Sequence, residues 1–305
     1  MGLTEFFVTE RPGIRRLHPM PETRTAEFRD AHDIAIIYDV HPAEGDVRGV
    51  VQLLHGVGEH AGRYGALIAA LTGAGFTVYA DDHRGHGRTG MRQHGDPEKL
   101  GRLGPGGLNA AVDAVWQLTQ IIRSENPGLP LILLGHSWGS FLSQKLVNRH
   151  PEAYDAVILS GSAHLTPSDL NAAPLNARWA GDDATGLEWL SRDPAVQEEF
   201  RNDPLTTEVP LLKLFGVIEA AKLYGRPKKN LGHDIPLLLL VGRDDSVGGP
   251  RSVHKLADAY RTRSGLTDVT TLVYPDARHE IFNELQQDEV RADVLAWLDK
   301  HFPRA

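Results

Sequence analysis

A short apolar stretch, a glycine-flanked turn and a helical pattern follow one another around residue 137, and this order constrains the fold more than any other feature. Aliphatic residues 131–134 lead into the pentapeptide Gly135-His-Ser-Trp-Gly139. The helical pattern that follows ends at His150-Pro151, because proline cannot continue a helix. Glycines on both sides let a strand and a helix approach closely and hold the central residue in a strained, exposed turn. The stretch therefore predicts a strand-to-helix elbow that presents Ser137.

A serine presented in this way is a nucleophile only if other groups assist it. Its hydroxyl needs a histidine base within hydrogen-bond distance, and the oxyanion that forms after attack needs N–H donors. The amide of Trp138, at the start of the expected helix, is one candidate donor. Without such partners the pentapeptide is also consistent with a glycine-rich connector that merely contains a serine.

Strand and helix patterns alternate along most of the chain. Residues 24–29 and 34–40 flank a turn and predict an antiparallel hairpin. Further buried strands are expected at residues 49–54, 77–80, 131–134, 156–159, 237–241 and 269–274. Apolar residues have helical spacing at residues 67–71, 108–122, 141–148 and 290–298. Alternation of this kind predicts an α/β fold with a mostly parallel sheet and helices on both faces.

The alternation stops between residues 162 and 233, a span rich in proline. Helical fragments are expected there around Trp179, Trp189 and Phe200, and an amphipathic piece at residues 211–223. Ligands of open α/β sheets bind beyond the carboxyl ends of the strands, where such an insertion would lie as a lid. We therefore expect three segments: a first part of the core at 1–161, a helical cap at 162–233 and a second part of the core at 234–305.

Charge and composition exclude several classes of protein. A net charge of −8 without a long basic block gives sequence-independent nucleic-acid binding little electrostatic support. The chain has no cysteine, which excludes a disulfide framework, a thiolate zinc site and a cysteine nucleophile. The longest apolar run, around residues 236–241, suits a buried strand and is far shorter than a membrane span.

The first residues, Met1-Gly-Leu-Thr-Glu-Phe6, lack the charged start and apolar stretch of a signal peptide. Phe6 also breaks the N-myristoylation pattern. We therefore expect a cytoplasmic protein that does not span a membrane.

The histidine base is expected in the loop after the last strand. Of the 15 histidines, His279 alone occupies that position, although a surface histidine at a helix start would look the same. The carboxylate that orients it is expected after the preceding strand, where Asp244 and Asp245 are adjacent. Successive side chains of extended backbone point in opposite directions, so only one of them faces His279. We choose Asp245, and the reversed assignment stays open.

A second oxyanion donor is expected after the strand at residues 49–54. That strand runs into His55-Gly-Val-Gly-Glu-His60, whose glycines let the backbone bend so that the amide of Val57 faces the site. A plain turn would also explain the glycines, but not their position after this strand.

Several motifs together resemble a known family. They are His55-Gly-Val-Gly-Glu-His-Ala-Gly-Arg-Tyr64, Asp82-His-Arg-Gly-His-Gly-Arg88, Gly135-His-Ser-Trp-Gly139, Gly242-x-x-Asp245 and Arg278-His-Glu280. The combination is similar to the monoacylglycerol lipase and lysophospholipase branch of the α/β-hydrolases, and it extends over roughly residues 25–300.

The resemblance implies an α/β-hydrolase fold with an inserted helical cap that shapes an acyl pocket. It also implies a triad of Ser137, Asp245 and His279, oxyanion amides at Val57 and Trp138, and no cofactor. Its Gly-x-x-Asp pattern favours Asp245 over its neighbour. The implied activity is serine carboxylic-ester hydrolysis of monoacylglycerols, lysophospholipids or similar monoacyl esters through an acyl-enzyme.

Two positions depart from the family pattern. Monoacylglycerol lipases usually carry methionine where this chain has Trp138, and glycine where it has Ser140. The backbone amide survives either change, so the chemistry is expected to persist. A bulky indole beside the nucleophile is expected to reshape the pocket.

The histidines at 55–60 and 83–86 are expected to brace loops by hydrogen bonds rather than to bind a metal. Epoxide hydrolases and haloalkane dehalogenases share this architecture but use aspartate as the nucleophile, so Ser137 argues against both. A serine aminopeptidase or amidase on the same core would need acidic cap residues to bind a free amine. Candidates for that role are Asp182, Asp183, Glu188, Glu198 and Glu199. A hydrolase-fold binding protein would usually have lost a triad member, and none is missing.

A basic cluster lies in the expected cap, at Gly225-Arg-Pro-Lys-Lys229. Together with Leu211, Leu212, Leu214 and Phe215, if these are exposed, it would let the cap touch a lipid surface. A solvated loop is the alternative. The expected partners are thus a small acyl ester and, transiently, a membrane or micelle, and the sequence does not indicate an oligomeric state.

Overall fold

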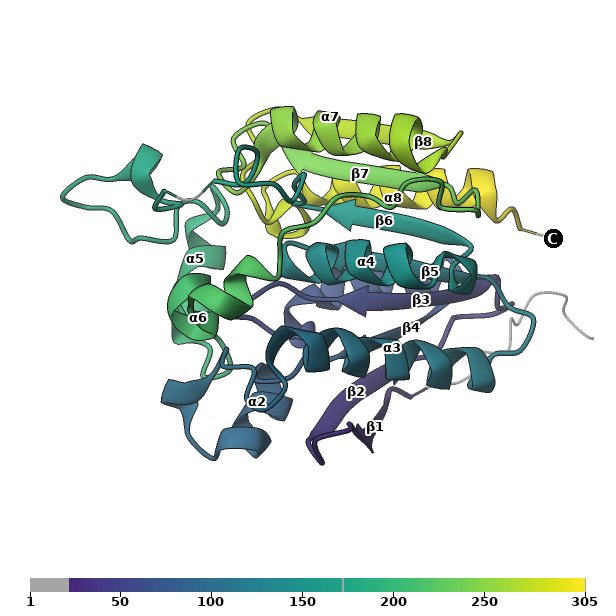
Figure 1. The fold of residues 1–305 in the computed structure, drawn as a ribbon, viewed down its shortest axis with the longest axis horizontal. Helices are drawn as coiled ribbons and strands as arrows, with labels where there is room; N and C mark the ends of the chain where they lie inside the picture. Colours follow the sequence, from purple (N-terminus) through teal and green to yellow (C-terminus); the bar gives the residue numbers. More distant parts are fainter. Residues whose placement is uncertain (1–21, 172, 305) are drawn as a thin grey trace, which may run out of the picture.

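Eight strands form one sheet through the centre of the molecule (Figure 1). The computed structural model describes residues 22–171 and 173–304. The expectations about a signal peptide and myristoylation at the first residues lie outside this part of the chain. The strands are Arg24–Arg29 (β1), Ala35–His41 (β2), Gly49–Leu54 (β3), Phe76–Asp81 (β4), Leu131–His136 (β5), Ala156–Ser160 (β6), Leu237–Gly242 (β7) and Val269–Tyr274 (β8).

The strand order is β1-β2-β4-β3-β5-β6-β7-β8. The hairpin β1–β2 is antiparallel, as predicted, and β2 also pairs antiparallel with β4. Every other neighbouring pair, from β4–β3 across to β7–β8, is parallel. The predicted mostly parallel sheet is confirmed.

Helices cover both faces of the sheet. The helices are Gly65–Gly73 (α1), Gly87–His94 (α2), Gly107–Glu125 (α3), Trp138–Arg149 (α4), Pro194–Asn202 (α5), Leu211–Ala221 (α6), Gly249–Ala259 (α7) and Gln287–His301 (α8). Apolar side chains of α3, α4 and α7 pack into one core cluster, and those of α1 and α8 pack into the other. Figure 1 shows α3, α4 and α7 in front of the sheet.

The central strands are apolar along their whole length because both of their faces are covered. In β5, Leu131 and Leu133 point into the first cluster, whereas Ile132 and Leu134 point into the second. This two-sided burial explains why the central strands appear in the sequence as continuous aliphatic runs rather than as alternating patterns.

The segment between β6 and β7 lies beyond the carboxyl ends of the parallel strands, on the left of Figure 1. It carries the helices α5 and α6 and a short 3₁₀ turn, Ala177–Trp179. The expected helical fragment around Trp189 is wrong, because that residue lies in a turn. The side chain of Glu188 accepts hydrogen bonds from the amides of Thr185 and Gly186, and such local bonds favour a turn over a helix.

Helix α6 is also shorter and more bent than its sequence suggests. Gly216, with φ 75° and ψ 167°, breaks it within its length. Of the four apolar residues proposed for lipid contact, Leu214 and Phe215 are buried and Leu211 is half-buried, so Leu212 alone is exposed. Among the described residues, no helix combines the length and apolar composition needed to cross a lipid bilayer.

The ends of β7 and β8 run unusually close to the loop that follows β8. Gly242 pairs with Tyr274 at the end of both strands. A Cβ atom on Gly242 would lie 2.1 Å from the carbonyl oxygen of Arg278 and 2.3 Å from that of Ala277. Glycine is therefore needed where the loops after the two strands meet.

Replacing Gly242 by alanine tests this packing. We expect Gly242→Ala to lower the free energy of unfolding by about 1–3 kcal/mol, because the added methyl group overpacks against backbone. Gly73→Ala is the control, since a Cβ there has nothing within 4 Å. Urea unfolding followed by circular dichroism measures both variants. Equal unfolding midpoints for Gly242→Ala and the wild type would contradict the prediction.

Candidate active site

Ser137 lies in the tight turn between β5 and α4. Its backbone has φ 50° and ψ −122°, a region that L-residues rarely adopt. Its amide donates a hydrogen bond of 2.9 Å to the carbonyl oxygen of Ser160 at the end of β6. The strained elbow predicted from the pentapeptide is therefore present, and it is held by a bond to the neighbouring strand.

The two glycines of the pentapeptide allow the close packing that this turn requires. A Cβ on Gly135 would lie 2.6 Å from the carbonyl oxygen of Gly139. A Cβ on Gly139 would lie 2.3 Å from the carbonyl oxygen of Leu54, the last residue of β3. Helix α4 can begin beside β3 and β5 only because both side chains are absent.

Three side chains expected to act together meet above the sheet. The Nε2 atom of His279 is 2.8 Å from the Oγ atom of Ser137. The Nδ1 atom of His279 is 3.0 Å from Oδ1 of Asp245, an oxygen that also accepts a 2.8 Å bond from the amide of Val247. The three groups come from the loops after β5, β7 and β8 and are buried.

The neighbouring aspartate points elsewhere. Asp244 forms an ion pair of 2.6 Å with Arg178, at the surface. The two aspartates follow the end of β7, and Asp244 lies in a turn in which its amide donates to the carbonyl oxygen of Ala277. The turn, and not the alternation of extended backbone, separates their side chains.

His279 sits in a negative environment. Burial by itself lowers its pKa, but the charges of Asp245, Glu280 and Glu59 outweigh burial, so the pKa of His279 is raised above 6.5. The ring of His136 lies 4.9 Å from that of His279, and burial, followed by the nearby charge of His279, lowers the pKa of His136 to about 3. His136 is therefore neutral near pH 7.

Gly161, which the sequence did not single out, makes room for these rings. A Cβ on Gly161 would lie 2.9 Å from Cε1 of His279 and 3.0 Å from Cε1 of His136. Its φ of 55° also favours glycine. Its position after a core strand was the available signal in the sequence, but the contact itself depends on the fold.

The loop after β3, residues 55–60 and hereafter the oxyanion loop, approaches the serine from the other side. A Cβ on Gly56 would lie 3.1 Å from the Cβ of Ser137. Val57 and Trp138 line the same cavity as the serine. Within the described residues, the amides of Val57 and Trp138 donate no hydrogen bond to the protein.

The histidines of this region hold loops in place. The Nδ1 atom of His55 donates to the carbonyl oxygen of Gly56 at 2.7 Å, and its Nε2 accepts from the amide of His83 at 2.9 Å. Burial, then the neighbouring histidines, hold the pKa of His55 well below 6.5, so it is neutral. In the part of the chain that the structure describes, no group of three or more His, Asp or Glu side chains is arranged to bind a metal ion.

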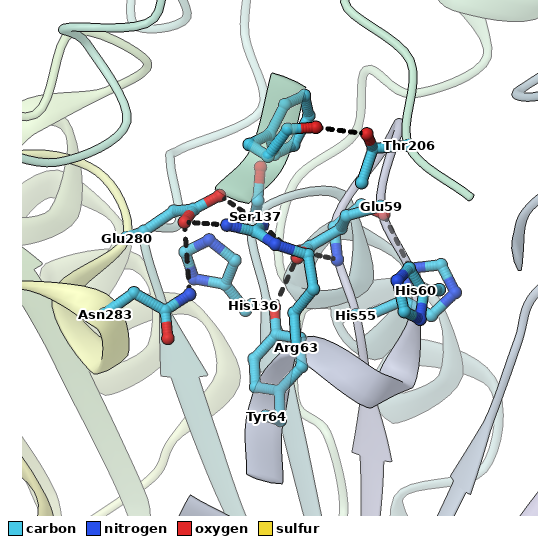
Figure 2. Close-up of polar contacts among 12 residues, drawn as sticks. His55, Glu59, His60, Arg63, Tyr64, His136, Ser137, Thr206, Glu280 and Asn283 are labelled. Carbon is cyan, nitrogen blue, oxygen red and sulfur yellow. Dashed lines mark hydrogen bonds and ion pairs between the residues drawn. The ribbon is translucent and has the colours of Figure 1, made fainter. Parts of the chain in front are cut away.

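A buried ion cluster beside the serine was missed in the sequence (Figure 2). Arg63 contacts both Glu59 and Glu280, and Tyr64 donates to Glu59 at 2.7 Å. Glu59 and Arg63 stand four residues apart in a motif noted above, and Glu280 follows His279. Their spacing was visible, but the contact between residues 63 and 280 was not.

A cavity of about 360 Å³ opens onto Ser137 and His279. Most of its lining is apolar and comes from the segment between β6 and β7. The apolar lining residues include Phe141, Leu170, Leu175, Leu187, Trp189, Leu190, Phe200, Val209, Leu211, Leu212, Leu223 and Val247. Such a lining suits an aliphatic chain better than a polar ligand.

The two departures from the family pattern are accommodated beneath this cavity. The indole of Trp138 is fully buried, stacks on His86 at 4.9 Å and contacts the ring of Phe215 in α6 at 5.3 Å. The hydroxyl of Ser140 lies 2.5 Å from the carbonyl oxygen of Ser137. The indole therefore supports α6, and the hydroxyl is bound to the elbow.

None of the five acidic residues named above for an aminopeptidase lines the cavity. Glu188 instead bonds to the Thr185–Gly186 turn and to Asn176. Glu208 reaches the rim, where it lies 3.4 Å from Arg201. The remaining candidates, which are exposed and away from the cavity, are Asp182, Asp183, Glu198 and Glu199.

Known proteins resemble this chain in sequence and in fold over most of its length. The chain is 34% identical over 286 residues to a monoacylglycerol lipase of Mycolicibacterium smegmatis, covering 90% of this chain and 96% of that relative. Its fold matches the open form of a lipase with a TM-score of 0.79 at 26% identity, covering 93% of this chain and all of the lipase. It also matches a soluble variant of the Saccharomyces cerevisiae monoglyceride lipase in complex with a substrate analogue, with a TM-score of 0.71 at 25% identity and coverage of 96% and 99%.

The sequence profile of the family described as serine aminopeptidase S33, Hydrolase_4, matches residues 45–286. That span includes β3 to β8 and every candidate site residue. The predicted α/β-hydrolase fold is thus confirmed, and so is the resemblance to monoacylglycerol lipases. This chain belongs to the Hydrolase_4 family of α/β-hydrolases.

Proposed function

We propose that this protein is a serine carboxylic-ester hydrolase that acts on monoacylglycerols or similar monoacyl esters. The observation that carries the proposal is the 2.8 Å separation between Oγ of Ser137 and Nε2 of His279, both of which line an apolar cavity. Similarity to monoacylglycerol lipases over nearly the whole chain supports ester hydrolysis as the reaction.

In the proposed mechanism, His279 takes the proton of Ser137 as the hydroxyl attacks the ester carbonyl. Asp245 holds the imidazole in position and stabilises its protonated form. The amides of Val57 and Trp138 stabilise the oxyanion, and loss of one such donor typically costs about 10²–10³ in rate. The alcohol leaves with the proton from His279, and water activated by the same imidazole then releases the fatty acid from the acyl-enzyme.

The segment 162–233 is proposed to be the cap that selects the acyl chain, between core segments 1–161 and 234–305. The apolar side chains that it contributes to the cavity support this role. Each methylene buried is worth about 0.8 kcal/mol, so a few carbons separate good from poor substrates.

Hydrolysis of lysophospholipids and hydrolysis of amides are the two alternative activities. Lysophospholipids carry the same acyl ester on a charged headgroup and would enter through the same cavity. The amidase alternative is not favoured, because none of the five acidic cap residues named for it lines the cavity. A cytoplasmic location stays a prediction.

The cap is also proposed to contact lipid surfaces. Val217 and Ile218 at the end of α6 are 73% and 75% exposed, and Leu212 is 57% exposed. Exposed basic residues lie near them in the sequence: Lys213, Lys222, Arg226, Lys228 and Lys229. Apolar side chains flanked by lysine and arginine suit an anionic membrane interface that supplies the substrate.

Serine replacement tests the nucleophile. We expect Ser137→Ala to lose at least about 10³ of the ester-hydrolysis rate, since the nucleophile is removed while binding remains. Labelling by a fluorophosphonate probe should disappear in the same variant. Ser168→Ala, an exposed serine of the cap, should keep both activity and labelling. The preferred substrate is then found by comparing hydrolysis rates for p-nitrophenyl esters of graded length, monoacylglycerols, lysophospholipids and aminoacyl amides. A preference for amides would overturn the ester proposal.

The pH profile tests the base. His279 must be neutral to accept a proton, and its pKa is raised, so kcat/KM should fall on acidification with an apparent pKa above 6.5. Asp245→Asn removes the first of the charges that raise the pKa of His279. The acid limb of the profile, in which kcat/KM falls as the pH is lowered, should therefore move to lower pH in this variant. In addition, kcat should drop by about 10⁴. An acid limb that does not move in Asp245→Asn would argue against this assignment.

Charge insertion tests the lipid contact. We expect Val217→Glu/Ile218→Glu to weaken binding to vesicles of phosphatidylcholine and phosphatidylglycerol by at least about tenfold, because burying each side chain is worth about 1.5–3 kcal/mol. Hydrolysis of a short soluble ester should not change. Val47→Glu is the matched control, because Val47 is a 46% exposed valine that lies outside the cap. Co-sedimentation that is unaffected by the cap variant or by anionic lipid would contradict the proposal.

A further inference from the structure

Arg63 lies at the centre of the ion cluster beside the serine (Figure 2). It belongs to the short 3₁₀ turn Ala61–Tyr64 that follows the oxyanion loop, and its side chain is 5% exposed. Its Nη1 and Nη2 atoms each donate a 2.7 Å hydrogen bond to one oxygen of Glu280. Nη1 also donates to Glu59 at 2.8 Å. A planar guanidinium is suited to such a fork, which an ammonium could not form.

Glu59 links Arg63 to the backbone of the oxyanion loop. Its second carboxylate oxygen accepts a 2.6 Å hydrogen bond from the amide of Gly56 and a 2.7 Å bond from the hydroxyl of Tyr64. The next residue after Gly56 is Val57, whose amide is the proposed oxyanion donor. The orientation of that amide therefore depends on a carboxylate that Arg63 holds.

Glu280 links Arg63 to the loop that carries His279. It follows His279 directly, and its amide donates a 2.7 Å bond to the carbonyl oxygen of Leu190 in the cap segment. Asn283 donates to its carboxylate at 3.1 Å. The guanidinium thus joins the loops on two sides of Ser137 without contacting the reacting atoms.

The cluster also balances charge in a buried space. Two carboxylates, 3% and 4% exposed, share one guanidinium, so with both carboxylates ionised the cluster carries one net negative charge next to the imidazole. The ring of Phe200 in α5 lies 4.7 Å from the guanidinium and closes it off from solvent. The titratable groups around His279 are Asp245, Glu59, Glu280, Arg63, Tyr64 and His136.

We propose that Arg63 is a positioning residue for the ester hydrolysis, which orients the oxyanion loop and the base together and neutralises one of the two carboxylates beside them. The inference rests on the proposed function. Arg63 is thus expected to affect both the rate of hydrolysis and the pH at which kcat/KM falls on acidification. A purely structural role in holding the loops would change stability without changing that pH.

The test compares three variants with the wild-type full chain. We expect Arg63→Gln to lower kcat by about 10–100-fold, because misplacement of catalytic groups by an ångström has effects of that order. The same variant leaves a second uncompensated charge near His279, so its acid limb should move up by about one pH unit. Arg63→Gln/Glu280→Gln restores the original net charge and should move the limb back. Arg63→Lys keeps the charge but not the fork, so it should keep the wild-type limb with a reduced kcat.

The readout is the pH dependence of kcat/KM with a soluble ester, together with the rate of fluorophosphonate labelling. The labelling rate reports on Ser137 and His279 whatever the natural substrate is, so a wild type that labels but hydrolyses no ester refutes the proposed function and not this inference. Coincident acid limbs for Arg63→Gln and the wild type would overturn it. So would a double variant whose limb stays with that of Arg63→Gln. If Arg63→Gln does not fold, Glu280→Gln decides: removal of one negative charge should shift the limb to lower pH, and an unchanged limb would overturn the inference.

Discussion

The left-handed backbone at Ser137 is the constraint on which the rest of the structure depends. Such a conformation costs about 1–3 kcal/mol and persists only where its surroundings hold it. Here α4 starts against the backbone of β3, which is open to it because residue 139 has no side chain, and β6 binds the amide of the serine. Sheet order and the elbow are thus two parts of one arrangement, because the strands on both sides of β5 hold the turn.

Buried charge is the second requirement of this site. The imidazole of His279 is buried beside an apolar cavity, and burial alone would lower its pKa. Carboxylates from separate loops offset that effect, and one of them is neutralised in turn by a guanidinium under an aromatic ring. Breaking a buried ion pair by removing one partner typically costs about 3–5 kcal/mol. A cluster of this kind therefore couples the stability of the loops to the protonation of His279.

Much of the fold and most of the candidate site could be predicted from the sequence, and the failures have physical causes. The β-strands were recognised because two-sided burial produces continuous aliphatic runs, as in β3 and β5. Helices α2 and α7 did not stand out. Helix α2 is mostly polar and glycine-containing, and α7 begins with Gly249 and Pro250, which mask its apolar face. The turn at Trp189 depends on hydrogen bonds that the amides of Thr185 and Gly186 donate to the side chain of Glu188, and these bonds outweigh the helical spacing of nearby apolar residues.

The sequence by itself determined the chemical groups and their order along the chain: a serine in a glycine-flanked turn, then Asp245, then His279, each after an apolar strand. Local patterns were enough for this, because strand ends and tight turns depend on neighbouring residues. Only the tertiary structure decided that Asp245 rather than Asp244 faces the imidazole, that the indole of Trp138 lies beneath α6, and that Arg63 joins Glu280 across 217 residues. Those contacts depend on how separate strands and loops are oriented in space, and that orientation arises only when the sheet packs between its helices.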